Sequence, residues 1–86
     1  MTEEFSKIME EIVADTAPRL FAVFHEVGQE DDCWVAAWGL AFDDRAEAVT
    51  PPGALRVTAS SPEQTARHFP RSKGLTAHLV WVASVN

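Results

Sequence analysis

Few residues of this 86-residue chain have the types and spacing that catalysis needs. Its one cysteine, Cys33, together with a histidine could provide a thiol nucleophile. Cys33 begins an apolar segment beside Trp34, where a cysteine usually behaves as a small buried hydrophobic residue. No glycine-rich nucleotide fingerprint, nucleophile elbow, His-Glu-x-x-His or Cys-x-x-Cys occurs. We therefore predict no catalytic residue and expect a protein that is not an enzyme.

Two histidines, His25 and His78, fall in predicted strands, each within a largely apolar face. If those strands were neighbours, the two rings could approach each other and form a metal site or a proton-transfer pair. A histidine in a strand is more often a hydrogen-bonded structural residue, which is the outcome we expect here. A small-molecule pocket between the first helix and the sheet, near these rings, is a third interpretation of function.

Acidic residues gather in two short stretches, and neither has the Asp-x-Asp-x-Asp-Gly spacing of a calcium loop. We expect both to be solvated turns and predict no metal site. An acidic inhibitor or immunity-type protein that covers a basic partner is the alternative function, and its binding residues would be Glu30, Asp31, Asp32, Asp43 and Asp44. The basic group from Arg67 to Lys73 lacks a glycine-rich loop for phosphate, so we predict no cofactor.

The net charge of −6 is unevenly placed along the chain. Residues 1–47 contain 12 acidic and three basic residues, a net charge of −9, whereas residues 48–86 carry +3. An acidic surface argues against a nucleic-acid partner, because the phosphate backbone selects basic faces. No apolar run approaches the ~18 residues of a membrane span. The acidic N-terminus does not resemble a signal peptide, and the lone cysteine fits a reducing compartment, so we expect a cytoplasmic protein.

A first helix is predicted from Thr2 to about Ala14, because its apolar residues recur with helical spacing at Phe5, Ile8, Met9, Ile12 and Val13. Pro18 helps to end it. Two strands, Arg19–Val27 and Cys33–Phe42, follow as a hairpin around Gly28. Further elements are a strand over Ala54–Ser60, a short helix capped by Ser61 that ends near Phe69, and a last strand over Leu75–Ser84. The residues from Asp43 to Pro52 are expected to form a charged turn and an irregular segment.

These elements predict a single α+β domain over residues 1–86, with the order α-β-β-β-α-β. We expect a two-layer sandwich in which two helices pack on one face of a four-stranded sheet and the first helix provides most of the cover. The second strand separates its side chains by size. We expect the bulky face to meet the first helix and the small face, with Ala37 and Gly39, to form a flat apolar shelf. The bulky residues are Trp34, Trp38, Leu40 and Phe42.

The second strand has no charged residue on either face, and the last strand is also apolar on both sides. A chain of this size has a small core, and its single cysteine excludes an internal disulfide. Small chains of this kind often gain stability by association. We therefore expect a non-enzymatic interaction domain that forms a homodimer through an apolar sheet face. The residues predicted for this interface are Trp34, Val35, Ala37, Trp38, Gly39, Ala41 and Trp81.

Overall fold

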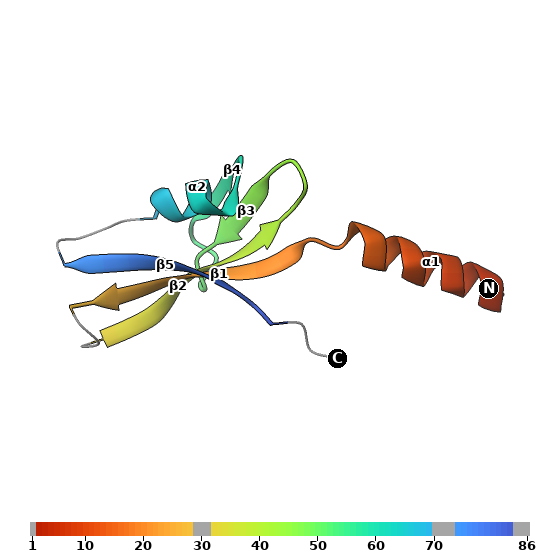
Figure 1. The fold of residues 1–86 in the computed structure, drawn as a ribbon, viewed down its shortest axis with the longest axis horizontal. Helices are drawn as coiled ribbons and strands as arrows, with labels where there is room; N and C mark the ends of the chain where they lie inside the picture. Colours follow the sequence, from red (N-terminus) through yellow and green to blue (C-terminus); the bar gives the residue numbers. More distant parts are fainter. Residues whose placement is uncertain (1, 29–31, 70–73, 84–86) are drawn as a thin grey trace.

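The structure of this chain is a computed structural model that describes residues 2–28, 32–69 and 74–83. Within these residues it has an α+β fold with two helices and one antiparallel sheet of five strands, in the order β4-β3-β2-β1-β5 (Figure 1). In chain order the elements are α1 (Glu3–Thr16), β1 (Arg19–Val27), β2 (Asp32–Ala41), β3 (Ala46–Val49), β4 (Arg56–Ala59), α2 (Pro62–Arg67) and β5 (Leu75–Trp81).

The central hairpin agrees with the prediction from sequence. β1 and β2 pair in antiparallel register from Arg19 opposite Ala41 to Val27 opposite Asp32. Gly28 follows β1 with φ of 66°, a left-handed conformation that glycine adopts without a steric penalty. The pairing is shifted by one residue between Val23 and Phe24, so β2 contains a bulge at this level. The bulge reverses the face to which the residues at the start of β2 point.

The strand β3 corrects the expected four-stranded sheet, because the segment assigned to a turn and an irregular stretch pairs with strands on both sides. Ala46 lies opposite Ala41 of β2 and opposite Ala59 of β4. Alanine and glutamate have low strand propensity, and the segment has only four residues, so its local sequence gives little signal. Its two neighbours determine its conformation. The element order is therefore α-β-β-β-β-α-β in the described residues.

The core lies between the sheet and α2, on the small-residue face of β2, and not on the bulky face as predicted. Phe21, Val23 and Ala37 are fully buried, together with the alanines of β3 and Phe69 beyond α2. The ring of Phe21 occupies the space over Gly39, where an added Cβ would lie 2.1 Å from Phe21 Cζ. Only small side chains on β2 and β3 allow this ring and a helix to lie so close to the backbone.

The short helix α2 starts at the predicted cap. The hydroxyl of Ser61 accepts a hydrogen bond of 3.2 Å from the backbone N–H of Gln64, with Pro62 at the first helical position. Thr65 and Ala66 are the buried residues of α2. This helix packs on one face of the sheet only (Figure 1).

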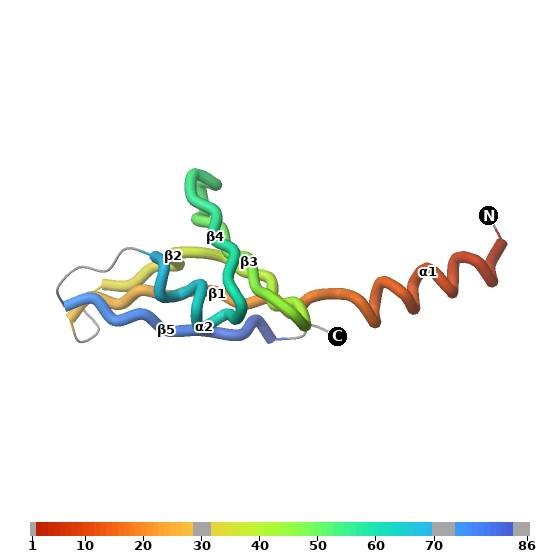
Figure 2. The backbone as a smooth tube through the Cα atoms, turned by 90° about the horizontal axis from the view of Figure 1, so that it is seen from above, coloured from red at the N-terminus to blue at the C-terminus, as the bar shows by residue number. Residues whose placement is uncertain are grey.

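The long helix α1 does not cover the sheet, which corrects the expected two-layer arrangement. Its start agrees with the prediction, since the Thr2 hydroxyl accepts a 3.2 Å hydrogen bond from the N–H of Phe5. However, none of its residues is buried, and it projects away from the sheet beyond the beginning of β1 (Figure 2). The molecule is accordingly elongated, with extents of 56 × 25 × 21 Å.

We expect Gly39→Ala to lower the free energy of unfolding by about 1–3 kcal/mol, because the added methyl group overlaps the Phe21 ring. Urea unfolding followed by circular dichroism measures this change. The double variant Phe21→Leu/Gly39→Ala serves as the control for mechanism: it should lose less stability than the sum of the two single changes. Additive losses would show that the Phe21 ring is not the obstacle.

Candidate functional site

The sheet face opposite α2 is open and apolar. Residues that pair across antiparallel strands share a face, and the pairs Leu20–Leu40, Ala22–Trp38 and Trp38–Val49 place one set of side chains there. Val80 of β5 joins this set opposite Ala22. We call this surface the open face, and its members are Leu20, Ala22, Phe24, Trp38, Leu40, Val49 and Val80.

Most of the large side chains of the open face are in contact with solvent. Trp38 is 42% exposed, Leu40 is 40% exposed and Val80 is 47% exposed, with Leu20 and Val49 in the same range. Leu20, Trp38 and Val49 also line a shallow hollow with a volume of about 370 Å³, together with the charged residues Glu47 and Arg56. Contiguous apolar surface of this kind on a small domain is typical of a site that binds another molecule.

A cluster of ion pairs lies on the open face, on its β3 and β4 side. Glu47, opposite Leu40, accepts a hydrogen bond from the Arg56 guanidinium of β4 and one of 3.3 Å from Arg45 Nε. The hydrogen bond from Arg56, followed by that from Arg45, lowers the pKa of the Glu47 carboxyl below its ordinary value. The open face is therefore apolar over β1 and β2 and carries charged groups toward β4.

The two histidines lie on neighbouring strands but on opposite faces. His25 pairs with Ala77, and His78 pairs with Phe24. Because successive side chains of a strand point to opposite faces, the two rings lie on opposite sides of the sheet. His25 is buried on the α2 side, with its ring edge-on to Trp34 at 5.9 Å between centroids. His78 binds Glu26 through Nε2 and Oε1 at 3.0 Å. The metal site or proton-transfer pair considered from sequence is therefore not formed.

The residues predicted for the interface divide between the two faces. Trp38 lies on the open face, whereas Val35, which pairs with Phe24 beyond the bulge, lines a hollow with His25 and Phe69. Ala37, Gly39 and Ala41 face α2, where Ala37 is fully buried.

The other two predicted tryptophans also lie on the α2 side. The bulge places Trp34 beside His25 on that face. Trp81 pairs with Phe21 and contacts its ring edge-on at 5.7 Å, and the Arg19 guanidinium lies 4.1 Å from its centroid. Leu20, Val49 and Val80 of the open face were not among the predicted interface residues. Alternation along β1 and β5 would have indicated Leu20 and Val80, whereas Val49 lies on β3, which was not predicted as a strand.

The acidic residues do not form a single patch in the described part of the chain. Asp32 begins β2, and its Oδ1 accepts a 2.9 Å hydrogen bond from the N–H of Cys33. Asp43 and Asp44 follow the other end of β2, about 33 Å away for a strand of this length. Glu30 and Asp31 lie outside the described residues.

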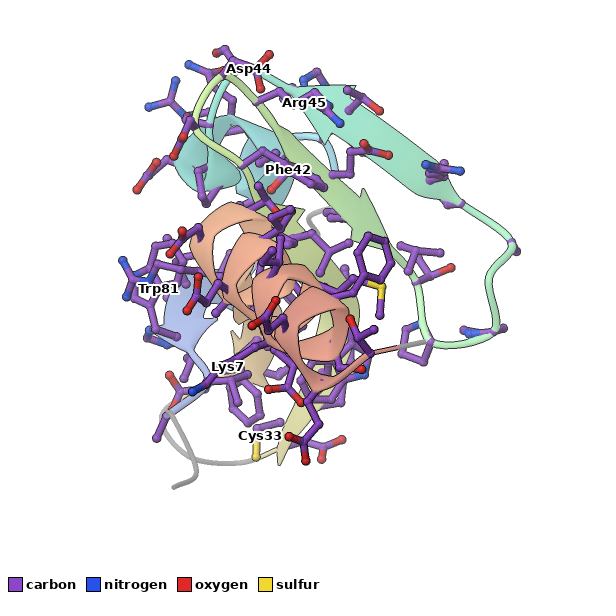
Figure 3. All side chains as sticks on the ribbon, turned by 90° about the vertical axis from the view of Figure 1, so that its right-hand side faces the viewer. Lys7, Cys33, Phe42, Asp44, Arg45 and Trp81 are labelled. Carbon is purple, nitrogen blue, oxygen red and sulfur yellow. The ribbon has the colours of Figure 1, made fainter. Side chains whose placement is uncertain are left out.

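Two residues expected in an apolar environment are placed differently. Cys33 is the second residue of β2 and is exposed, whereas its neighbours in the sequence predicted a buried position. Phe42 follows β2 and is only partly covered, by the Arg45 guanidinium at 4.2 Å from its ring centroid. Phe42, Asp44 and Arg45 lie together at one margin of the sheet (Figure 3). The Asp44 carboxylate accepts a 3.1 Å hydrogen bond from Arg45.

Among residues 2–28, 32–69 and 74–83, no group of three or more histidine, cysteine or acidic side chains could hold a metal ion. In the same ranges no helix has both the length and the apolar character needed to cross a membrane. Comparison with protein-family models, curated proteins and solved structures gave no match.

The Glu47 ion pairs predict a defined pH dependence. Because the pKa of Glu47 is lowered in the folded state, its carboxylate stabilises the fold above its unfolded-state pKa, and this contribution is lost as the pH falls through the folded-state pKa. Glu47→Gln should therefore lower the urea midpoint at pH 7, and its difference from the wild type should vanish at strongly acidic pH. Glu63→Gln, on the exposed side of α2, is the control. An equal difference at both pH values would contradict the ion-pair role.

Proposed function

We propose that this chain is a non-enzymatic protein-interaction domain that self-associates as a homodimer through the open face. The observation that carries this proposal is the solvent exposure of Trp38 and Leu40 at the centre of the sheet. Burial of apolar surface contributes about 25 cal/mol per Å², and tryptophan is enriched among the residues that dominate binding energy. Neither helix covers these side chains within one chain.

The small core of the monomer supports the same proposal. Among the described residues, eight apolar residues are buried, and five of them are alanines. Phe21, Val23 and Phe69 are the larger ones. A large buried side chain contributes about 1.5–3 kcal/mol, whereas alanine contributes much less, so this core gives the isolated chain a small stabilising term. Association through the open face would add burial that the monomer lacks.

The oligomeric state tests the proposal. Gel filtration with light scattering should give a mass close to twice the 9.5 kDa of one chain at micromolar concentrations. Leu40→Glu places a charge at the centre of the open face and should weaken dimerisation by about 2 kcal/mol or more, roughly 30-fold in the dissociation constant. His68→Glu, exposed on the α2 side, is the matched control and should leave the dimer intact. A wild-type chain that stays monomeric at 100 μM, on the order of a weak Kd, would refute the proposal.

Salt dependence separates this function from the acidic alternative. The dissociation constant of an apolar homodimer should change by less than about threefold between 50 and 500 mM salt, because its contacts carry little net charge. Capture of a basic protein by Asp43 and Asp44 would instead weaken steeply with salt. Sedimentation equilibrium at the two salt concentrations measures the difference. A strongly salt-sensitive dimer would point to charged groups as the binding residues.

A further inference from the structure

The helix α1 carries a second apolar surface without a partner. Its stripe residues follow the i, i+3, i+4, i+7, i+8 spacing of one helix side, and their exposed fractions run from 36% for Met9 to 66% for Val13. No charged residue interrupts this side. A helix of 14 residues is marginal in water without tertiary packing. The stripe, which consists of Phe5, Ile8, Met9, Ile12 and Val13, therefore needs an apolar surface to stabilise the helix.

The connection to β1 directs this helix away from its own sheet. Ala17 is extended, with φ of −62° and ψ of 131°, the conformation that a following proline favours. Only Ala17 and Pro18 separate α1 from β1. The helix continues outward from the start of β1 in both perpendicular views (Figures 1 and 2). For α1 to reach the open face of its own chain, the backbone would have to reverse direction at these two residues.

The dimensions of the two surfaces match. The 14 residues of α1 span about 21 Å along the helix axis. The four strands that carry the open face, at about 4.8 Å per strand, span roughly 19 Å. The apolar stripe, from Phe5 to Val13, takes up about 13 Å of the helix, so it can lie over most of the width of the open face.

The area needed for a stable dimer also favours use of the helix. A specific interface buries about 800 Å² on each partner. Four strands carry the open face, and four residues of each, the length of β3, give a flat area of roughly 250 Å². One side of α1, about 21 Å long and roughly 10 Å across, adds roughly 200 Å² on the same protomer. An interface formed by the two sheets alone would bury less area on each partner than one that also uses the helix. It would therefore be further below the area of about 800 Å² that a specific interface buries.

We propose that α1 of each protomer lies across the open face of the other, so that the two chains exchange their N-terminal helices. This inference rests on the proposed self-association and names the segment that occupies the open face. The stripe of α1 contacts Leu20, Trp38, Leu40 and Val49 of the partner, and the acidic side of the helix stays in water. The dimer is closed, because each chain offers one helix and receives one.

Cross-linking between two different chains tests the exchange. In a Cys33→Ser background, one chain carries Met9→Cys on α1 and the other carries Val49→Cys on the open face. After the chains are mixed, a flexible bismaleimide should link the two species at a yield at least fivefold above either chain alone. Predominant Val49–Val49 links would show sheet-against-sheet dimers, and closure within a single chain carrying both cysteines would show that α1 folds back. Either result overturns the exchange.

Stripe variants of the full chain provide a second measurement. Ile8→Gln/Ile12→Gln should weaken dimerisation at least tenfold by light scattering. Glu10→Gln/Ala14→Gln, on the opposite side of α1, is the matched control and should change the dissociation constant by less than twofold. If the stripe variant dimerises like the wild type while Leu40→Glu is monomeric, the exchange is wrong and the proposed function stands. If the wild type is monomeric, both are wrong.

Discussion

The contact between the Phe21 ring and Gly39 sets the arrangement of the whole sheet. The ring fills the space that a side chain at position 39 would need, so this face of β2 must carry small residues. Small residues also occupy the neighbouring core positions, and they allow α2 to pack close to the strands. These residues are Ala37, Ala46 and Ala48. Because successive residues of a strand point to opposite faces, the same register directs Trp38 and Leu40 to the side without a helix. The apolar open face is thus a direct consequence of how the core is built.

Both exposed apolar surfaces result from where the large apolar side chains lie in this chain. The residues of the sheet and α2 form a core of short side chains, whereas many of the larger ones lie on α1 and on the open face. In a self-contained domain the longer helix would cover the broader apolar face. Here Pro18 and the extended conformation of Ala17 direct α1 away from the open face. Both surfaces therefore remain exposed to solvent in the individual chain.

The sequence predicted those elements whose signals are local. The stripe and Thr2 cap of α1, the Ser61 cap of α2 and the extent of β1 agree with the structure, and so does the α+β class. The strand β3 was missed because three of its four residues, Ala46, Glu47 and Ala48, have low strand propensity and the strand depends on pairing with its neighbours. The bulge that turns Trp34 to the α2 side was missed for a related reason, since one-residue shifts leave no mark in composition. The choice of covered face was also wrong: the prediction used side-chain size, but close approach of α2 required small residues.

Neighbouring positions along β2 are under different constraints, because successive side chains point to opposite faces of the sheet. A change at Ala37 or Gly39 alters the fold of the individual chain, whereas a change at Trp38 or Leu40 leaves that core in place and alters only the outer surface. As sequences diverge, the side chains at positions 38 and 40 are free to change type, whereas positions 37 and 39 must keep small residues. A strand of this design lets the outer surface change over evolutionary time while the chain still folds.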